Sequence, residues 1–158
     1  MALIDPGTKA PTFSLPDQSG ATHTLSAYAG RPVVLFFYPK DDTSGCTREA
    51  CGFQEALPEF TKVEAAILGI SILDTGSKAK FATKYGLTFP LLADADHAVC
   101  EAFGVWQEKS MYGRTYMGVA RVTYLIDAAG TVAQRWDAVK VEAHAAEVLA
   151  AVNALGAR

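Results

Sequence analysis

The segment RPVVLFFY, residues 31–38, is the feature that most limits how this chain can fold. Its apolar β-branched and aromatic side chains follow one another without polar alternation, so a strand formed here must be buried on both faces. A second run of this kind, AILGISIL at 66–73, comes after a segment whose apolar residues recur at helical spacing. Buried strands separated by helices are typical of the α/β class. We therefore expect a central, largely parallel sheet covered by helices on both faces.

The remaining segments continue this alternation. Helices are predicted from about Thr43 onward, over SKAKFATKYG and DHAVCEAFG, which end in glycines, and over the terminal EAHAAEVLAAVNALG. Strands are predicted in PTFSLPD, THTLSAY, FPLLAD, RVTYLID and TVAQRWDAV. The stretch between Gly104 and Arg121 is interpreted as a loop. Its larger side chains are expected to pack onto the core, with the lining of a pocket as the alternative; they are Trp106, Tyr112, Tyr116 and Met117.

Composition narrows the class of protein. The chain has 158 residues, half of them hydrophobic, and no linker or internal repeat, which predicts one domain over 1–158. A net charge of −3 without blocks of like charge gives no support for binding nucleic acid or an anionic membrane. The N-terminus lacks the pattern of a secretory signal, and no apolar run is long enough to span a bilayer. We expect a cytoplasmic protein, most simply a monomer.

Cys46 is one of only three cysteines, and it stands where chemistry is favoured in such folds. It follows the carboxyl end of a buried strand, where α/β proteins place their active sites. If the next helix begins near Thr43 or Ser44, both good capping residues, Cys46 lies in its first turn. Backbone N–H groups and the helix dipole there favour a thiolate. Pro39 would rigidify the strand exit, although a buried structural cysteine remains the alternative.

Cys51 adds a geometric constraint. On an intact helix, residues five positions apart have Cα atoms roughly 8.6 Å apart. A disulfide requires less than about 7 Å, so Cys46 and Cys51 can bond only after the first turns unwind. The spacing suits a transient redox couple and does not suit a permanent disulfide. A small core-facing residue is the alternative for Cys51.

The segment FFYPKDDTSGCTREACGF resembles the active-site segment of the peroxiredoxins. Their P-x-x-x-T/S-x-x-C motif is matched by Pro39, Thr43 and Cys46. The five-residue step to Cys51, together with WQEKSMYGRTYMGVARVTYLID, is similar to the bacterioferritin comigratory protein/PrxQ subfamily. The resemblance extends over nearly the whole chain. Ser44 stands where the subfamily often has proline, between the motif positions.

This resemblance implies a thioredoxin-like fold with a central mixed sheet flanked by helices, and a thiol peroxidase without metal, flavin or other cofactor. It implies that Cys46 is the peroxidatic cysteine, Cys51 the resolving one and Arg121 the cation beside the thiolate. The substrate would be hydrogen peroxide or an organic hydroperoxide. A Cys46 sulfenic acid would condense with Cys51, and a thioredoxin-type dithiol would reduce the disulfide.

Arg121 and Glu49 need separate interpretation. Arg121 opens the strand RVTYLI and shares a face with Thr123 and Leu125 by the period of two, although a solvated strand-end arginine is the alternative. Glu49 lies one turn after Cys46, where a bare carboxylate would disfavour the thiolate. It must therefore be paired or turned away; the resemblance suggests an arginine-linked role, and the alternative is a solvated helix position.

Cys100 is interpreted as a buried small side chain, with an alternative resolving thiol as the second possibility. His97 and Cys100 have a spacing that could contribute two zinc ligands, with Cys46 and Cys51 as the other pair, but the long separation between the pairs disfavours a zinc site. His23 and His144 have no recognisable partner. The competing functions are a thioredoxin-type oxidoreductase, which would be expected to carry C-x-x-C rather than C-x4-C, and a redox-sensing or zinc-binding module.

Overall fold

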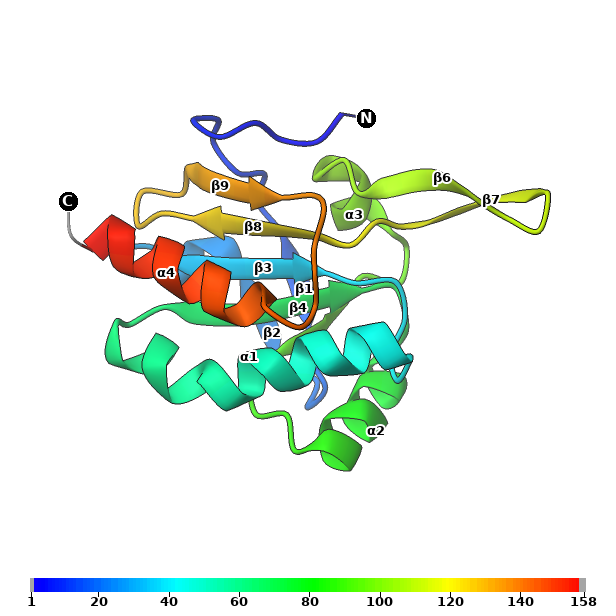
Figure 1. Ribbon diagram of the computed structural model, residues 1–158, viewed down its shortest axis with the longest axis horizontal. Coiled ribbons are helices and arrows are strands. Elements are labelled where there is room, and N and C mark those ends of the chain that lie inside the picture. The colour runs from blue at the N-terminus through cyan, green and yellow to red at the C-terminus, as the bar shows by residue number, and fades with distance from the viewer. Residues whose placement is uncertain (1, 157–158) are drawn as a thin grey trace.

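The computed structural model describes residues 2–156. Five strands form the central sheet in the order β5-β4-β3-β8-β9. Two small two-stranded sheets, β1-β2 and β6-β7, lie outside it (Figure 1). The strands are β1 (Ser14–Pro16), β2 (Thr22–Thr24), β3 (Val33–Phe37), β4 (Ala66–Ser71), β5 (Leu91–Ala93), β6 (Trp106–Met111), β7 (Arg114–Val119), β8 (Val122–Ile126) and β9 (Val132–Trp136). The helices are α1 (Ser44–Lys62), α2 (Thr75–Tyr85), α3 (Ala98–Ala102) and α4 (His144–Gly156), with a 3-10 turn at Leu25–Tyr28.

The sheet is mixed, as the family resemblance implies, and the expectation of a largely parallel sheet is wrong. β3 pairs in parallel with β4, and β4 with β5. β8 pairs antiparallel with both β3 and β9. For the β8–β9 pair, the physical reason is the short connection over residues 127–131, where Gly130 has a φ of 85°, because a connection this short can join only antiparallel strands.

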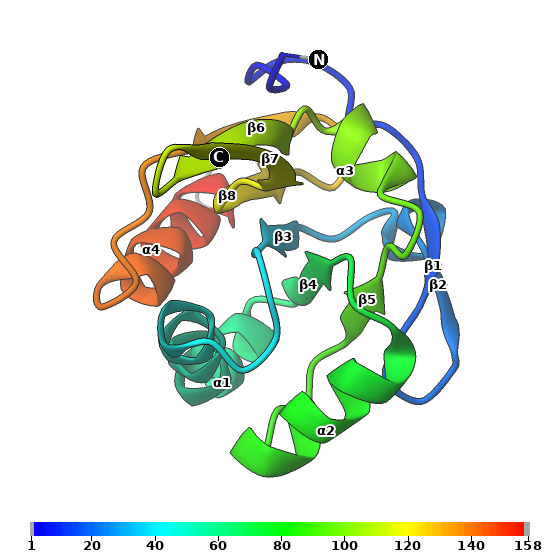
Figure 2. The ribbon, with the colours of Figure 1, turned by 90° about the vertical axis from the view of Figure 1, so that its right-hand side faces the viewer.

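Strand β3 is buried on both faces, as its unbroken apolar run predicts. Val33, Leu35 and Phe37 contribute to one apolar cluster, with α3 and the N-terminal segment. Val34 and Phe36 contribute to a second cluster on the opposite face, with α1, α2 and α4. Figure 2 shows these three helices on one side of the sheet and α3 with β1 and β2 on the other. The two clusters form a core of two layers.

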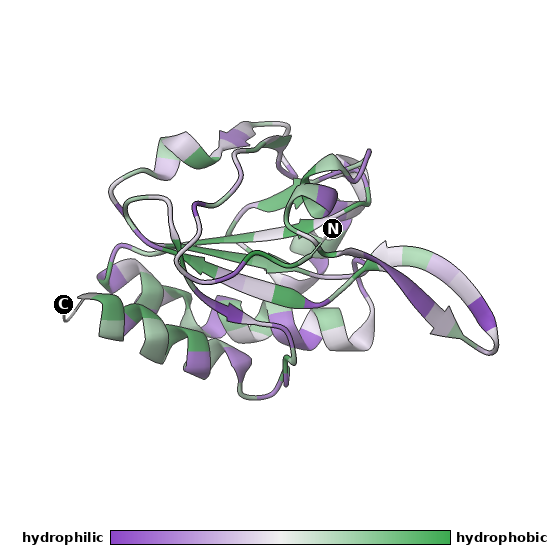
Figure 3. Cartoon of the chain, turned by 90° about the horizontal axis from the view of Figure 1, so that it is seen from above, coloured by the Kyte–Doolittle hydropathy of each residue, from purple (hydrophilic) through white to green (hydrophobic). Residues whose placement is uncertain are grey.

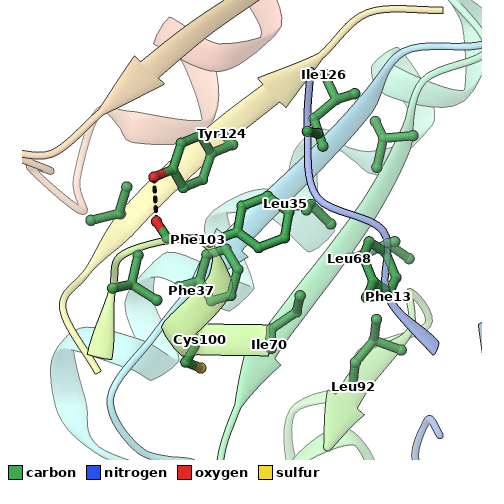
Figure 4. Packing of buried hydrophobic residues seen from close by; sticks show 14 of the residues in the cluster. Phe13, Leu35, Phe37, Leu68, Ile70, Leu92, Cys100, Phe103, Tyr124 and Ile126 are labelled. Carbon is green, nitrogen blue, oxygen red and sulfur yellow. Dashed lines mark hydrogen bonds between the residues drawn. The ribbon is translucent and has the colours of Figure 1, made fainter. Parts of the chain in front are cut away.

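The cluster that contains α3 is drawn in Figure 4. Phe103 lies against Phe37 and Tyr124, with ring centroids 5.2 and 5.3 Å away. The Tyr124 hydroxyl is satisfied within this apolar layer, because it donates to the Phe103 carbonyl at 2.6 Å. Cys100 is fully buried in the same cluster, in agreement with its interpretation as a small core side chain.

The hairpin β6-β7 replaces the loop expected between Gly104 and Arg121. It projects from the body of the molecule (Figures 1 and 3). Its turn is Tyr112–Gly113, and both residues have positive φ, at 53° and 76°. Trp106 packs partly onto the core, but the prediction of core packing is wrong for Tyr112, Tyr116 and Met117, which are exposed. The hairpin extends away from the core layer, so these side chains have no apolar surface to cover.

A smaller difference concerns THTLSAY. Only its first three residues form a strand, and Leu25–Tyr28 form a 3-10 turn. Within the part of the chain that the structure describes, no helix is both long and apolar enough to cross a membrane.

Gly69 allows β4 to lie close to the aromatic side chains of β3. A Cβ atom at Gly69 would stand 2.7 Å from Phe36 Cζ and 3.1 Å from Leu91 Cδ2, inside a fully buried strand. We predict that Gly69→Ala lowers the free energy of unfolding by about 1–3 kcal/mol, because the core must shift to admit the methyl group. Urea denaturation measures this change.

Gly52→Ala is the matched control. Its added methyl group would meet Ala145 Cβ at an ordinary 3.7 Å within α1. Alanine is the better helix former, so this variant should gain about 0.5–1 kcal/mol. Equal stability of the Gly69→Ala variant and the parent protein would contradict the packing argument.

Candidate active site

Cys46 lies where its position in the sequence predicts. α1 begins at Ser44, and Thr43 is its N-cap residue with extended backbone angles, φ −91° and ψ 156°. Cys46 is therefore in the first turn, just beyond the carboxyl end of β3, and its side chain is 1% exposed. A thiol here faces a helix end that favours negative charge.

Arg121 connects Cys46 with Glu49. Its Nη2 donates to Cys46 Sγ at 3.2 Å, and its Nη1 donates to Glu49 Oε1 at 2.7 Å. Arg121 comes directly before β8, and the antiparallel pairing of Phe37 with Val122 brings the start of β8 next to the end of β3. Gly45 leaves room for the guanidinium, because a Cβ there would lie 3.2 Å from Nη2.

Glu49 is buried and paired with Arg121, as the requirement that it be paired or turned away allows, and the alternative of a solvated helix position is wrong. Its side chain is fully inaccessible, and burial raises the pKa of this carboxyl to about 7 even though Arg121 acts in the opposite direction. Burial works against the charge on Arg121, but Glu49 and Cys46 outweigh it and raise the pKa of the guanidinium. Each member of the cluster therefore depends on the charge state of the others.

His144 lies behind this cluster, and it is the residue that sequence reasoning left without a partner. It is the first residue of α4, and its Nε2 is 2.7 Å from Thr123 Oγ1 and 3.9 Å from Glu49 Oε2. Burial and the nearby positive charge of Arg121 lower the pKa of His144 to about 4. The shared face predicted for Arg121, Thr123 and Leu125 is confirmed, because all three face α1 and α4.

The loop that leads to Cys46 is attached to α2 by a buried lysine. Lys78 is fully buried, and its Nζ contacts Asp41 at 3.4 Å, the Tyr38 hydroxyl at 3.1 Å and the Ser71 hydroxyl. Burial lowers the pKa of Lys78, which Asp41 partly offsets. The only signal in the sequence was the position of Lys78 three residues before Phe81, on the apolar side of the predicted helix.

A second attachment lies at the exposed end of the same loop. Asp42 has a positive φ of 61°, and its carboxylate accepts from Lys84 Nζ at 2.9 Å and from the Tyr85 hydroxyl at 2.5 Å. The two attachments together hold the chain between β3 and α1 against α2. Asn and Asp tolerate this backbone region better than other residues with a side chain, which accounts for an aspartate at this position.

The other candidate residues lie in the loop before α1 or further along α1. The Thr43 hydroxyl donates to the Lys40 carbonyl at 3.2 Å, and Pro39 lies in the loop between β3 and α1. Cys51 is further along α1, partly exposed and unbonded, and burial together with Glu55 raises the pKa of its thiol.

Cys100 is separated from Cys46 by the central sheet. It belongs to the cluster with α3, whereas Cys46 belongs to the cluster with α1. Burial and Asp94 raise the pKa of the Cys100 thiol. Among residues 2–156, no three histidine, cysteine or acidic side chains gather in a group that could hold a metal ion. The geometry therefore does not support the four zinc ligands considered from the sequence.

The fold and this site define a class of protein when they are compared with known ones. The family model for the AhpC/TSA family matches residues 6–135, and the chain belongs to this family. It is 49% identical to "Peroxiredoxin Bcp" of Xanthomonas campestris over 147 residues, 92% of either chain. It is 46% identical to the protein of the same name from Escherichia coli over 144 residues, 91% of this chain and 92% of the other.

Solved structures of related proteins support the same family assignment. A bacterioferritin comigratory protein of Xanthomonas campestris, whose structures address alkyl peroxide reduction activity, matches with a TM-score of 0.89 and 44% identity, over 95% of this chain and 98% of that one. Xylella fastidiosa PrxQ matches with a TM-score of 0.93 and 36% identity, over 99% of either chain. The resemblance to the Bcp/PrxQ peroxiredoxins is confirmed, and so is the thioredoxin-like fold. The chain is an enzyme of the peroxiredoxin class.

Glu49 and His144 should give the stability of the fold two opposed pH dependences. Folded Glu49, with a pKa of about 7 against an ordinary 4.5, keeps a proton that the unfolded chain releases, so its contribution to stability falls as pH rises from 4.5 to 7. Folded His144, with a pKa of about 4 against 6.5, lacks a proton that the unfolded chain binds, so its contribution rises from pH 4 to 6.5. The two slopes offset each other in the parent protein.

Single variants should expose each slope. In Glu49→Gln, the free energy of unfolding should rise with pH by up to about 3 kcal/mol between pH 4 and 6.5. In His144→Gln, it should fall by up to about 3 kcal/mol between pH 4.5 and 7. Urea denaturation over a pH series measures both, and slopes of the same sign in the two variants would contradict the assignment.

Proposed function

We propose that this chain reduces hydrogen peroxide and organic hydroperoxides through Cys46. The observation that carries this proposal is the Cys46 thiol in the first turn of α1, with Arg121 Nη2 donating to its sulfur at 3.2 Å. The helix end and a permanently charged guanidinium both favour a thiolate. The related protein from Xanthomonas campestris, studied for its alkyl peroxide reduction activity, supports a substrate range that includes organic hydroperoxides.

The first step is attack of the Cys46 thiolate on one peroxide oxygen. The sulfur–oxygen bond forms while the oxygen–oxygen bond breaks, and the electron pair of that bond leaves on a hydroxide or alkoxide ion. This ion takes up a proton to become water or an alcohol. The sulfur is oxidised by two electrons to a sulfenic acid, and the peroxide is reduced. No metal or other cofactor is needed.

The groups around Cys46 would orient the peroxide. We assign this role to the Thr43 hydroxyl, to Arg121 and to the backbone N–H groups of Gly45 and Cys46, because donors at a helix start can stabilise the developing negative charge. Pro39 would stiffen the exit from β3. Glu49 holds Arg121 at 2.7 Å and so fixes the direction of the guanidinium toward the sulfur.

Cys51 is the resolving cysteine in this proposal. Both cysteines are free and lie on one intact helix, so the first turns of α1 must open before they can meet. The Cys51 thiolate then attacks the Cys46 sulfur: the S–S bond forms while the S–O bond breaks, and the sulfenic oxygen leaves as hydroxide, which takes up a proton from solvent to become water. Cys100 is a poor substitute because it is buried on the opposite face of the sheet.

A dithiol of the thioredoxin type would reduce the disulfide and complete the cycle. We further propose a single domain over 1–158 that acts as a monomer in the cytoplasm, without nucleic acid or membrane partners. The net charge of −3, without blocks of like charge, argues against a nucleic-acid or anionic-membrane partner.

Single cysteine substitutions should separate the steps. After one equivalent of hydrogen peroxide, mass spectrometry of the parent protein should show a disulfide between Cys46 and Cys51. Cys46→Ser should consume no peroxide, since the attacking thiolate is gone. Cys51→Ser should accumulate an oxidised Cys46, because the resolving thiol is gone and the sulfenic acid persists.

Cys100→Ser is the control and should behave as the parent protein does. A bond between Cys46 and Cys100 would instead transfer the resolving role to Cys100. Undiminished peroxide consumption by Cys46→Ser would overturn the proposed function. Reduction of insulin that is unaffected by peroxide would favour a thioredoxin-type oxidoreductase.

Arg121→Lys should reduce the rate constant for peroxide reduction by roughly tenfold to a hundredfold. A lysine ammonium cannot reproduce the two directed bonds to Cys46 Sγ and Glu49 Oε1. Stopped-flow measurement of the reaction with hydrogen peroxide gives this rate constant.

Arg48→Lys is the matched control for this substitution. Arg48 lies on the same helix, but it is exposed and pairs with Glu142 at the surface. Its replacement should leave the rate unchanged. If Arg121→Lys were as fast as Arg48→Lys, the guanidinium would have no role beyond its charge.

A further inference from the structure

The hairpin β6-β7 carries most of the large apolar side chains that the structure leaves at its surface. Among residues 2–156, five such side chains are more than a third exposed, and all of them except Val63 belong to this hairpin. They are Met111, Tyr112, Tyr116 and Met117, and Tyr112 at the turn is 98% exposed. Apolar side chains that gather on one projecting element mark an interaction surface.

The two faces of the hairpin have different surroundings. Successive side chains of a strand alternate between the faces, and residues paired across the two strands share one face. The paired residues Trp106 and Val119 pack into the apolar cluster with α3, and the His97 ring stacks on Trp106 at 4.2 Å. Their face is therefore held against the core at its base. The opposite face, called the open face below, presents Lys109, Met111, Arg114 and Tyr116.

The open face begins beside the active site. The stem of Lys109 lies across Gly118, where a Cβ atom would stand 3.3 Å from Lys109 Cδ, and Gly118 is only three residues before Arg121. Burial and the charge of Arg121 lower the pKa of Lys109, while Cys46 acts in the opposite direction, so this ammonium group lies within electrostatic reach of the site. Figures 1 and 2 show the hairpin and the start of α1 at the same end of the molecule.

The charge of the open face favours one kind of occupant. It carries two cations, Lys109 and Arg114, and within the described part of the chain neither of them forms an ion pair. A second copy bound through the same face by two-fold symmetry would bring these cations against each other. A partner with acidic side chains around an apolar patch would complement them. The flexible Met111 side chain suits a contact that forms and breaks repeatedly.

We propose that the open face is the docking surface for the dithiol protein that reduces the Cys46–Cys51 disulfide, and that this partner presents an apolar patch flanked by acidic side chains. The inference rests on the proposed function, because the disulfide must form first. Exposed tyrosine and arginine side chains, here Tyr116 and Arg114, are the types that contribute most to binding at protein interfaces. Their position beside the site brings the thiols of the partner close to the disulfide.

The exchange itself balances between the two proteins. A thiolate of the partner attacks the Cys51 sulfur: a mixed disulfide forms, the Cys46–Cys51 bond breaks, and its electron pair leaves on Cys46 as a thiolate that Arg121 can stabilise. The second thiol of the partner loses its proton to solvent and attacks the sulfur of the first. The disulfide of the partner forms, and Cys51 leaves as a thiolate that takes up a proton from solvent. The partner is oxidised by two electrons and this protein is reduced.

Two reductants that differ in size test the docking surface. Thioredoxin, kept reduced by thioredoxin reductase and NADPH, needs a surface to dock, whereas dithiothreitol does not. Tyr116→Ser and Arg114→Glu should each lower kcat/KM for thioredoxin roughly tenfold, mainly through KM. Turnover with dithiothreitol and the single-turnover reaction of Cys46 with hydrogen peroxide should keep the rates of the parent protein, which also shows that the variants are folded.

Two matched controls lie away from the hairpin. Val63→Ser removes the one large exposed apolar side chain outside it among the described residues, at the far end of α1. Lys9→Glu makes the same change of charge as Arg114→Glu at an exposed lysine that pairs with Thr131, beyond the opposite end of β8. Both controls should keep the KM of the parent protein for thioredoxin. A rise in KM for Lys9→Glu equal to that for Arg114→Glu would overturn the local role of the open face.

The outcomes separate this inference from the proposed function. If the hairpin variants keep the KM of the parent protein while peroxide still produces the disulfide, the docking surface is excluded and the peroxidase function stands. Dimers of the parent protein that Tyr116→Ser dissociates in analytical ultracentrifugation would assign the open face to a second copy and overturn the inference. If peroxide produces no disulfide between Cys46 and Cys51, the proposed mechanism fails and this inference fails with it.

Discussion

Arg121 is the group on which the arrangement of the site depends, because it joins the start of β8 to the first two turns of α1. Its two donors contact Cys46 Sγ and Glu49 Oε1, residues one helical turn apart on one face. The contact orients the helix end, neutralises a buried acid and places a positive charge at the thiol. A planar guanidinium with several fixed donors can do this, whereas a single ammonium group cannot.

The surrounding structure holds the loop that leads to Cys46 in place. The loop before Cys46 is held to α2 through buried Lys78 and Asp41, where an ion pair and several hydroxyl groups satisfy one another. α1 itself has no such buried anchor at Cys51, which is partly exposed. The approach from β3 is therefore rigid, and Arg121 holds the start of α1 through Cys46 and Glu49. The opening proposed for disulfide formation must break these contacts.

The central sheet also separates Cys46 from Cys100. Cys46 and Cys100 are both buried, but they lie in apolar clusters on opposite faces. In the proposed mechanism, Cys51 rather than Cys100 is the partner of Cys46 because it lies on the same helix, not because of its burial or chemical type.

Local patterns were enough to predict the buried strand β3, the helix start at Ser44, the place of Cys46 in the first turn and the spacing to Cys51, because these follow from backbone periodicity over a few residues. The mixed sheet, the projecting hairpin and the partners of Glu49, Lys78 and His144 could not be predicted from such patterns. Those features depend on contacts between distant segments, such as the 72 positions between Glu49 and Arg121. Only the packing of β8 and α4 against α1 brings these groups into one buried volume, where the loss of water makes each charge depend on its neighbours.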